Sequence, residues 1–279
     1  MLRRPGRPTF VMPRTILLIG TLDTKGDEFA YVRGLIHQRG HRTLVMDAGV
    51  MQAPPFTPDF DAAEVAEAGG GTLDLLRRDA DRGRAVETMT RGVCALARRL
   101  DAEGRIDGVL GLGGSGGTAV ATAAMRVLPV GLPKVMVSTI ASGDVAPYVG
   151  VKDVTMMYSV VDIAGLNRIS RQILANAVGA VCGMAEQAVP EAEDKPLVAA
   201  TMFGVTTPCV TRVRERLEAK GYEVLVFHAT GSGGRAMEAL IEGGFIAAVA
   251  DVTTTEWCDE LVGGVLSAGP HRLEAAARR

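Results

Sequence analysis

The chain is poor in the residues on which several classes of protein depend. Aromatic residues make up 4% of its 279 residues, with a single tryptophan, and only four cysteines and four histidines occur. The cysteines lie far apart, at Cys94, Cys182, Cys209 and Cys258. This spacing contains neither a Cys-x-x-Cys metal pair nor a small disulfide framework, and no His-x-x-Glu-His grouping is present. We therefore predict no metal site.

Long apolar runs and an excess of charge of one sign are also missing. No run of about 18 apolar residues occurs, and residues 1–14 lack the apolar core of a signal peptide, so we expect a cytoplasmic protein without a membrane span. Thirty basic residues stand against 32 acidic residues, which gives a formal net charge of −2. This balance argues against nucleic acid and membrane surfaces as partners and leaves small anionic ligands open.

The remaining composition is typical of a soluble α/β protein with a large core. Hydrophobic residues make up 47% of the chain, charged residues make up 22%, and glycine contributes 34 residues. The length corresponds to about two domains. Short apolar strands alternate with helical segments along the whole chain, and this order favours doubly wound, mainly parallel sheets.

The polar stretch 190–196, which is bounded by prolines, is the predicted domain boundary. It follows an N-terminal extension, 1–14, and a first domain, 15–189, and it precedes a second domain, 197–279. In the first domain we expect strands at 15–20, 43–47, 106–110, 134–138 and 154–158, and helices at 27–38, 62–68, 84–103, 119–127 and 163–186. In the second we expect strands at 197–202, 223–227 and 245–250, and helices at 208–220 and 235–242.

The most informative stretch is Gly111-Leu-Gly-Gly-Ser-Gly-Gly-Thr118, which lies between a predicted strand and a predicted helix. Glycines let the backbone approach a ligand, and the free N–H groups at the start of a helix attract an anion. We favour phosphate binding here, although the same glycines would also allow a strand and a helix to pack closely. Gly117 stands where a Walker A motif has its lysine, and no Asp or Glu follows between 119 and 143 to hold a ribose hydroxyl. The loop is therefore neither a Walker A motif nor a good dinucleotide fingerprint.

Polar residues also follow three other predicted strands, in Thr21–Gly26, at Asp47 and in Thr139–Asp144. Open α/β sheets bind ligands at the carboxyl ends of their strands. The hydroxyls, carboxylates and lysine at these positions are therefore candidates for contacts with phosphate, ribose or a metal-bound water. The alternatives are an ordinary helix cap by Asp23 or Thr24 and, in the third stretch, a plain turn.

The second domain contains a glycine loop of its own, Gly231-x-Gly233-x-x-Ala236, which follows a strand and opens a helix. Asp251 lies 20 residues after Gly231, at the end of the next strand. This spacing fits a dinucleotide fingerprint better than the first glycine loop does. An NAD(P)-dependent oxidoreductase that uses this loop is therefore an alternative function.

Several of these stretches together resemble the tomato mosaic virus resistance protein family of ATP-binding proteins. The likeness rests on Gly20–Gly26, Gly111–Thr118 and Ser138–Asp144, in that order, and continues through Val198–Thr207 and Thr230–Gly234. It extends over nearly the whole chain, and several long motifs in register make it specific. The resemblance implies two Rossmann-like domains, ATP bound mainly by the first of them, and a dimer.

The resemblance also sets limits on what can be carried over. In plants the related domain binds a tobamovirus replication protein, whereas bacterial members have no settled activity, so an antiviral role is not implied. Members of the family usually continue well past the equivalent of Arg279. With only three predicted strands in the second domain, we expect that domain to be incomplete or to be completed by another chain.

The sequence thus predicts an ATP-binding protein in which the nucleotide gates a binding surface, with slow or no hydrolysis. We expect the triphosphate on main-chain N–H groups of 113–118, Lys25 as its cation, Asp47 on ribose or adenosine, and Asp144 on a magnesium-bound water. An ATP-dependent enzyme or hydrolase is another alternative, with Asp23 or Asp144 positioning water. Expected partners are the small nucleotide, a second copy of the chain and an unidentified protein. The predicted site comprises Thr21, Asp23, Thr24, Lys25, Asp47, Gly113, Gly114, Ser115, Gly116, Gly117, Thr118, Thr139, Ser142, Gly143 and Asp144.

Overall fold

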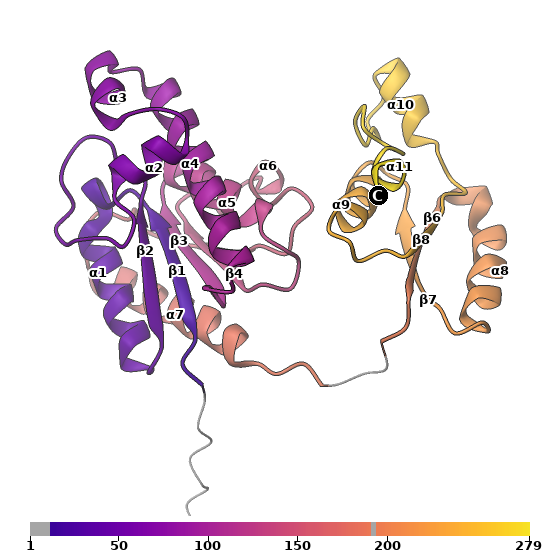
Figure 1. Cartoon of the computed structure of the whole chain (residues 1–279), viewed down its shortest axis with the longest axis horizontal. Helices are drawn as coiled ribbons and strands as arrows, with labels where there is room; N and C mark the ends of the chain where they lie inside the picture. The colour runs from indigo at the N-terminus through magenta and orange to yellow at the C-terminus, as the bar shows by residue number, and fades with distance from the viewer. Residues whose placement is uncertain (1–11, 191–193) are drawn as a thin grey trace, which may run out of the picture. The chain divides into compact units, whose positions relative to one another are not determined.

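The computed structural model describes residues 12–190 and 194–279. Most of the predicted N-terminal extension, residues 1–11, and part of the predicted boundary, residues 191–193, therefore lie outside the described residues. The chain divides into two compact units, Met1–Ala188 and Val189–Arg279, each with a parallel sheet of its own (Figure 1).

The sheet of the first unit has five parallel strands in the order β2-β1-β3-β4-β5. These strands are β1 (Thr15–Gly20), β2 (Arg42–Asp47), β3 (Gly108–Gly113), β4 (Lys134–Ser138) and β5 (Thr155–Tyr158). In the register of the sheet Gly20 lies opposite Asp47, and Gly113 lies opposite Ser138. The carboxyl ends of the first four strands therefore meet at one edge, and the chain leaves β1 toward β2 on one side and returns to β3 on the other.

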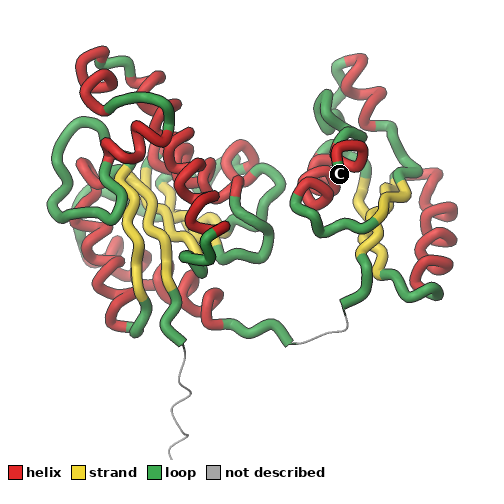
Figure 2. The backbone as a smooth tube through the Cα atoms, in the orientation of Figure 1, coloured by secondary structure: helices red, strands yellow, loops and turns green. Residues whose placement is uncertain are grey.

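Helices cover both faces of this sheet (Figure 2). The helices are α1 (Leu22–Gln38) and α7 (Arg168–Glu186) on one face and α2 (Ala62–Ala68), α4 (Arg82–Ala102) and α5 (Ser115–Val127) on the other, with two short ones, α3 (Leu73–Asp79) and α6 (Ala146–Val149). Helix α4 buries Met89, Val93, Leu96 and Leu100, which recur at the spacing of one helical face. Each face of the sheet thus has its own apolar core.

Helix α2 spans the predicted residues 62–68, whereas several other helices of the first unit begin at positions other than those predicted. Helix α1 begins at Leu22 instead of 27, and α5 begins at Ser115 instead of 119. Their first turns contain glycine, serine and threonine, whose low helix propensity favoured a loop in the sequence. Helix α7 begins at 168 instead of 163 because the side chain of Asn167 accepts hydrogen bonds from the N–H groups of Ile169 and Ser170, both at 2.9 Å. Helices α3 and α6 were not predicted.

The second unit is smaller and has three parallel strands in the order β7-β6-β8. Its elements are β6 (Leu197–Met202), a 3-10 turn (Gly204–Thr206), α8 (Thr207–Glu218), β7 (Glu223–His228), α9 (Ser232–Glu242), β8 (Ala248–Ala250), α10 (Glu256–Val262) and α11 (Ala275–Arg278). Its apolar core is formed mainly by Ala199, Met237, Ile241 and Ala275. The predicted α/β class with two Rossmann-like sheets is therefore confirmed.

Within the described parts of the chain, no helix combines the length and the apolar character that crossing a bilayer requires.

Candidate functional site

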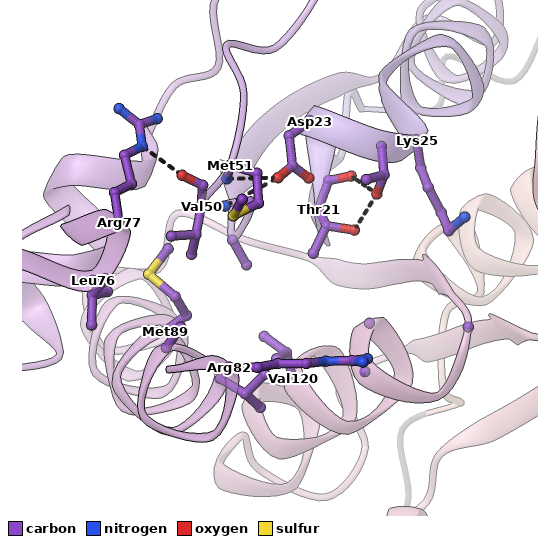
Figure 3. Close-up of a pocket in the computed structure, with 18 of the residues that line it drawn as sticks. Thr21, Asp23, Lys25, Val50, Met51, Leu76, Arg77, Arg82, Met89 and Val120 are labelled. Carbon is purple, nitrogen blue, oxygen red and sulfur yellow. Dashed lines mark hydrogen bonds between the residues drawn. The ribbon is translucent and has the colours of Figure 1, made fainter. Parts of the chain in front are cut away.

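A cavity of about 560 Å³ opens at the carboxyl edge of the first sheet (Figure 3). It is lined by residues that follow β1, β2 and β3, together with α3 and the start of α4. This is the place where the strand order reverses, and open α/β sheets bind ligands at such a point. The volume lies in the range of about 300–1,000 Å³ that is usual for small-molecule sites.

The glycine loop forms one wall of the cavity. Gly114, Ser115, Gly116 and Gly117 line it, as the N-cap and first turn of α5. No side chain caps this helix, and the N–H groups of a first helical turn have no acceptor within the helix. The wall therefore presents main-chain donors and the positive end of a 13-residue helix to the cavity.

The glycines of this loop were interpreted either as a phosphate-binding loop or as allowing close packing of a strand and a helix. In the structure, these two interpretations apply to different glycines. A Cβ atom added at Gly113 would lie 2.8 Å from Cα of Gly117, so Gly113 allows the strand and helix to pack closely. A Cβ atom added at Gly116 would have only Nη2 of Arg82 nearby, at 3.9 Å. None of the glycines between 111 and 117 has a positive φ angle. Gly116 thus leaves space in the cavity and is not required by strained backbone.

The first turn of α1 forms the opposite wall, with Thr21, Asp23, Thr24 and Lys25. Oδ2 of Asp23 accepts hydrogen bonds from the N–H groups of Val50 at 3.2 Å and Met51 at 3.0 Å, which holds the loop after β2 against the cavity (Figure 3). The hydroxyl of Thr24 donates to the carbonyl of Thr21 at 3.3 Å. Neither side chain caps α1, so the alternative of an ordinary helix cap is wrong.

Lys25 interrupts α1, because its backbone angles (φ −133°, ψ 23°) are not helical. Its ammonium group donates a hydrogen bond to the carbonyl oxygen of Ile163, which precedes α7. The interruption and this contact place the cation at the rim of the cavity, on the wall opposite the glycine loop (Figure 3). The predicted phosphate cation therefore lies on the surface of the cavity.

Asp47 lies behind the cavity surface, at the end of β2, and is only 1% exposed. Its Oδ1 accepts hydrogen bonds from the N–H groups of Leu22 at 3.0 Å and Gly49 at 2.8 Å. Burial raises the pKa of this carboxyl group above its usual value, and these hydrogen bonds oppose the shift. Its predicted contact with ribose is therefore corrected: Asp47 holds together the two loops that line the cavity.

Six other predicted residues do not line the cavity: Gly113, Thr118, Thr139, Ser142, Gly143 and Asp144. Thr118 is fully buried, and its hydroxyl lies 2.7 Å from the hydroxyl of Ser138. Asp144 is exposed and accepts a hydrogen bond from the N–H group of Ala146 at 2.9 Å. The stretch Thr139–Asp144 thus forms a turn, and Asp144 is not placed to position water or magnesium in this cavity.

The apolar wall of the cavity was not predicted; it comes from α3, α4, α5 and the loop after β2. Its side chains include Val50, Met51, Leu76, Val86, Met89 and Val120. Val86 and Met89 lie in the predicted helix 84–103, where apolar side chains fit a core as well as a cavity wall, and α3 was not predicted. Arg77 and Arg82 also line the cavity, and both lie outside the helices that were predicted. The cavity surface carries Lys25 and these two arginines against Asp23 and Asp81.

The glycine loop of the second unit holds a carboxylate from its own chain. Oε1 of Glu256, which is 1% exposed, accepts hydrogen bonds from the N–H groups of Gly231 at 2.7 Å and Gly234 at 3.0 Å. Nη2 of Arg272 donates to Oδ1 of Asp251 at 2.9 Å. The main-chain donors and the acidic residue of the predicted dinucleotide fingerprint are therefore already engaged, which argues against the NAD(P) alternative.

Among residues 12–190 and 194–279, no group of three histidine, cysteine, aspartate or glutamate side chains is arranged to hold a metal ion.

Two bacterial proteins and a plant protein show how far the similarity of this chain extends. The chain is 56% identical over 267 residues to a UPF0261 protein of Clostridium tetani, which covers 95% of this chain and 66% of that protein. It is 49% identical over 265 residues to UPF0261 protein RA0729 of Rhizobium meliloti, covering 95% and 65%. It is 40% identical over 284 residues to ToMV resistance protein Tm-1(GCR237) of Solanum lycopersicum, covering 93% and 37%. The chain thus spans just under two thirds of the length of these bacterial relatives.

The solved structures that match are much more distant. A crystal structure of Acinetobacter baumannii MurG is 13% identical with a TM-score of 0.31, covering 87% of this chain and 68% of that one. A co-structure of Staphylococcus aureus MnaA with UDP is 11% identical with a TM-score of 0.31, covering 88% and 71%. Likeness at this level carries no argument about function.

Matches to a described family span both units. Residues 14–190 match the N-terminal domain, and residues 195–279 match the C-terminal domain, of the uncharacterised protein family UPF0261. The chain therefore belongs to the UPF0261 family.

Proposed function

We propose that the first unit binds ATP in the cavity between α1, α4 and α5, and that the nucleotide gates a binding surface with slow or no hydrolysis. The observation that carries this proposal is the uncapped first turn of α5, which faces a cavity of about 560 Å³. Main-chain N–H groups at the start of a helix bind phosphate through hydrogen bonds and through the helix dipole. Lys25, on the other wall, supplies a cation.

The remainder of the cavity suits a flat, weakly polar group such as adenine. Val86, Met89 and Val120 line it beside Val50 and Met51. Small-molecule sites are usually apolar clefts in which a few polar groups fix the orientation of the ligand. A phosphate end on α5 and an apolar end against α4 together match a nucleotide, whose two parts have these properties.

Slow hydrolysis follows from the hydrogen bonds and positions of the acidic side chains that line the cavity. Oδ2 of Asp23 is held by the N–H groups of Val50 and Met51, and Oδ1 of Asp81 accepts from the N–H group of Arg84 at 3.1 Å. Oδ1 of Asp23 is buried and has no hydrogen-bond partner in the described residues, and Asp81 is turned toward the start of its own helix. Neither carboxylate is therefore placed to position an attacking water as nucleotide hydrolases require. Magnesium, which accompanies ATP, would be held mainly by the phosphate oxygens.

A thermal-shift panel of ATP, ADP, AMP, NAD and NADP tests the proposal. A ligand present at about 100 times its dissociation constant stabilises a folded protein by about 2.7 kcal/mol. We expect ATP to raise the melting temperature of the protein. We also expect the bound ATP to remain unhydrolysed after incubation for many minutes. Stabilisation by NAD or NADP alone, or turnover of many ATP molecules per second, would contradict it.

The gating part of the proposal, with a homodimer or another protein as partner, is tested by molecular mass. Sedimentation of the full chain measures its molecular mass with and without ATP. We expect ATP to change either the fraction of homodimer or the amount of a second protein that sediments with the chain. The same mass and the same partners in both conditions would leave ATP as a ligand without a gating role.

A further inference from the structure

We propose that Arg82 is the residue that makes this cavity select ligands with two or three linked phosphates over ligands with one or none. This inference rests on the proposed function, because it concerns the same cavity. Arg82 lies outside the predicted helix 84–103, and no motif in the sequence pointed to it.

The position of Arg82 follows from the turn between α3 and α4. Arg82 is the first residue of α4, directly after its N-cap Asp81, and it lines the cavity. Its Nη2 atom lies 3.9 Å from the place that a Cβ atom would occupy on Gly116. Figure 3 shows the side chain extended along the cavity toward the start of α5. The guanidinium group therefore lies over the helical turn that is expected to bind phosphate.

This position is electrostatically unfavourable without an anion. The N-terminus of a helix carries a partial positive charge, which favours acidic residues and disfavours basic ones. Arg82 stands at the start of α4, a helix of 21 residues, and reaches toward the start of α5, a helix of 13 residues. The start of α4 is capped by the carboxylate of Asp81, whereas the start of α5 has no side-chain cap. The guanidinium group of Arg82 and the positive end of α5 thus converge on one part of the cavity, and a bound anion would be stabilised by both.

The neighbouring carboxylates are engaged elsewhere. Asp79 accepts from Nη1 of Arg84 at 2.7 Å and lies 3.7 Å from Nε of Arg78. Asp81 accepts from the N–H group of Arg84. Arg82 is exposed and has no ion pair or side-chain hydrogen bond with any residue in the described parts of the chain. Its guanidinium group is therefore available to a ligand, unlike those of the arginines two and four residues away.

The arrangement of the cations indicates how many phosphates the ligand carries. Arg82 and the first turn of α5 lie on one wall of the cavity, and Lys25 lies on the other (Figure 3). A guanidinium group binds two oxygens of a phosphate at once, whereas an ammonium group acts as a point charge. A single phosphate on α5 would be close to one cation, whereas a chain of two or three phosphates offers oxygens to both walls. The cavity therefore fits a nucleoside di- or triphosphate.

Calorimetric titration of Arg82→Gln with ATP, ADP, AMP and adenosine tests the inference, with Arg84→Gln as the matched control. Arg84 stands two residues further along the same helix and does not line the cavity, so the control removes the same charge from the same turn. We expect Arg82→Gln to weaken ATP and ADP at least tenfold, to weaken AMP less and to leave adenosine unchanged. Arg84→Gln should bind all four as the parent protein does.

Equal ATP affinity in Arg82→Gln and the parent protein, or an equal loss for ATP and adenosine, would overturn the inference. Inorganic tripolyphosphate separates this failure from failure of the proposed function. If the parent binds tripolyphosphate but no adenine nucleotide, and Arg82→Gln weakens that binding tenfold, ATP is the wrong ligand and the role of Arg82 stands. If the parent binds neither, both proposals fall.

Discussion

Lys25 lies where α1 is interrupted, and its contact with the carbonyl of Ile163 leaves a cation at the rim of the cavity. We expect Lys25→Ala to weaken ATP binding about tenfold or more, because a charge-assisted hydrogen bond contributes about 1.5–3 kcal/mol. Lys152→Ala is the control, since Lys152 also donates to a main-chain carbonyl, that of Leu128 at 3.4 Å, but does not line the cavity. Equal affinities in the two variants, measured by calorimetry, would remove Lys25 from the site.

Asp47 should affect stability in a way that depends on pH. Burial raises its folded-state pKa above the usual 3.8, so the folded protein holds this proton more tightly than the unfolded chain. The resulting stabilisation is present at low pH and is lost as the pH rises through the folded-state pKa. Asparagine cannot ionise but can still accept the hydrogen bonds from Leu22 and Gly49. The stability of Asp47→Asn relative to the parent should therefore increase as the pH rises from about 4 to 7.

Asp47→Ala is the matched comparison, because it removes the acceptor as well as the charge. It leaves the N–H groups of Leu22 and Gly49 without their partner, and we expect a loss of about 1–3 kcal/mol at every pH. Urea denaturation of both variants at several pH values measures the difference. Parallel pH profiles for Asp47→Asn and the parent would show that the ionisation of Asp47 does not influence folding.

At the scale of the element, two glycines at the start of α5 have different roles: Gly116 faces the cavity, whereas Gly113 allows close packing of β3 and α5. Gly116→Ala places a methyl group in open space beside Arg82, with no positive φ angle to penalise it, so we expect full stability and weaker ATP binding. Gly113→Ala places the same methyl group 2.8 Å from Cα of Gly117, so it should lower the free energy of unfolding by about 1–3 kcal/mol through overpacking. Thermal melts together with ATP titration of both variants test this assignment. Lower stability in Gly116→Ala with full stability in Gly113→Ala would contradict it.

The same elements show what could be predicted from the sequence. The strands 134–138 and 197–202 are found where they were predicted, because each is an apolar run bounded by polar or proline residues. The helix starts at Leu22 and Ser115 were missed, since their glycine, serine and threonine residues favour loops when tertiary contacts are ignored. The position of Thr21, Lys25 and the loop 114–117 around one cavity could be predicted, because the strand ends meet at one edge of the sheet. Arg82 was missed because its role depends on the approach of α4 to α5.

At the scale of the whole molecule, two glycine loops of similar sequence have different surroundings. The loop 114–117 opens onto the cavity, whereas the loop at Gly231 is filled by Glu256, which lies 25 residues further along the chain. Local spacing cannot show which carboxylate reaches a loop in the folded chain. The dinucleotide fingerprint in the second unit was therefore a reasonable prediction from spacing, and the position of Glu256 is what argues against it.

This difference leads to a prediction for amide hydrogen exchange in the full chain. Ligand binding slows exchange where it adds hydrogen bonds or restricts opening. Saturating ATP should slow exchange in the first turn of α5 and at the start of α1, where the cavity offers main-chain groups to the nucleotide. The N–H groups of Gly231 and Gly234 already donate to Glu256, so their exchange should keep its unliganded rate. Slower exchange at these two glycines, with no change at Ser115–Gly117, would move the nucleotide to the second unit and return the NAD(P) alternative to consideration.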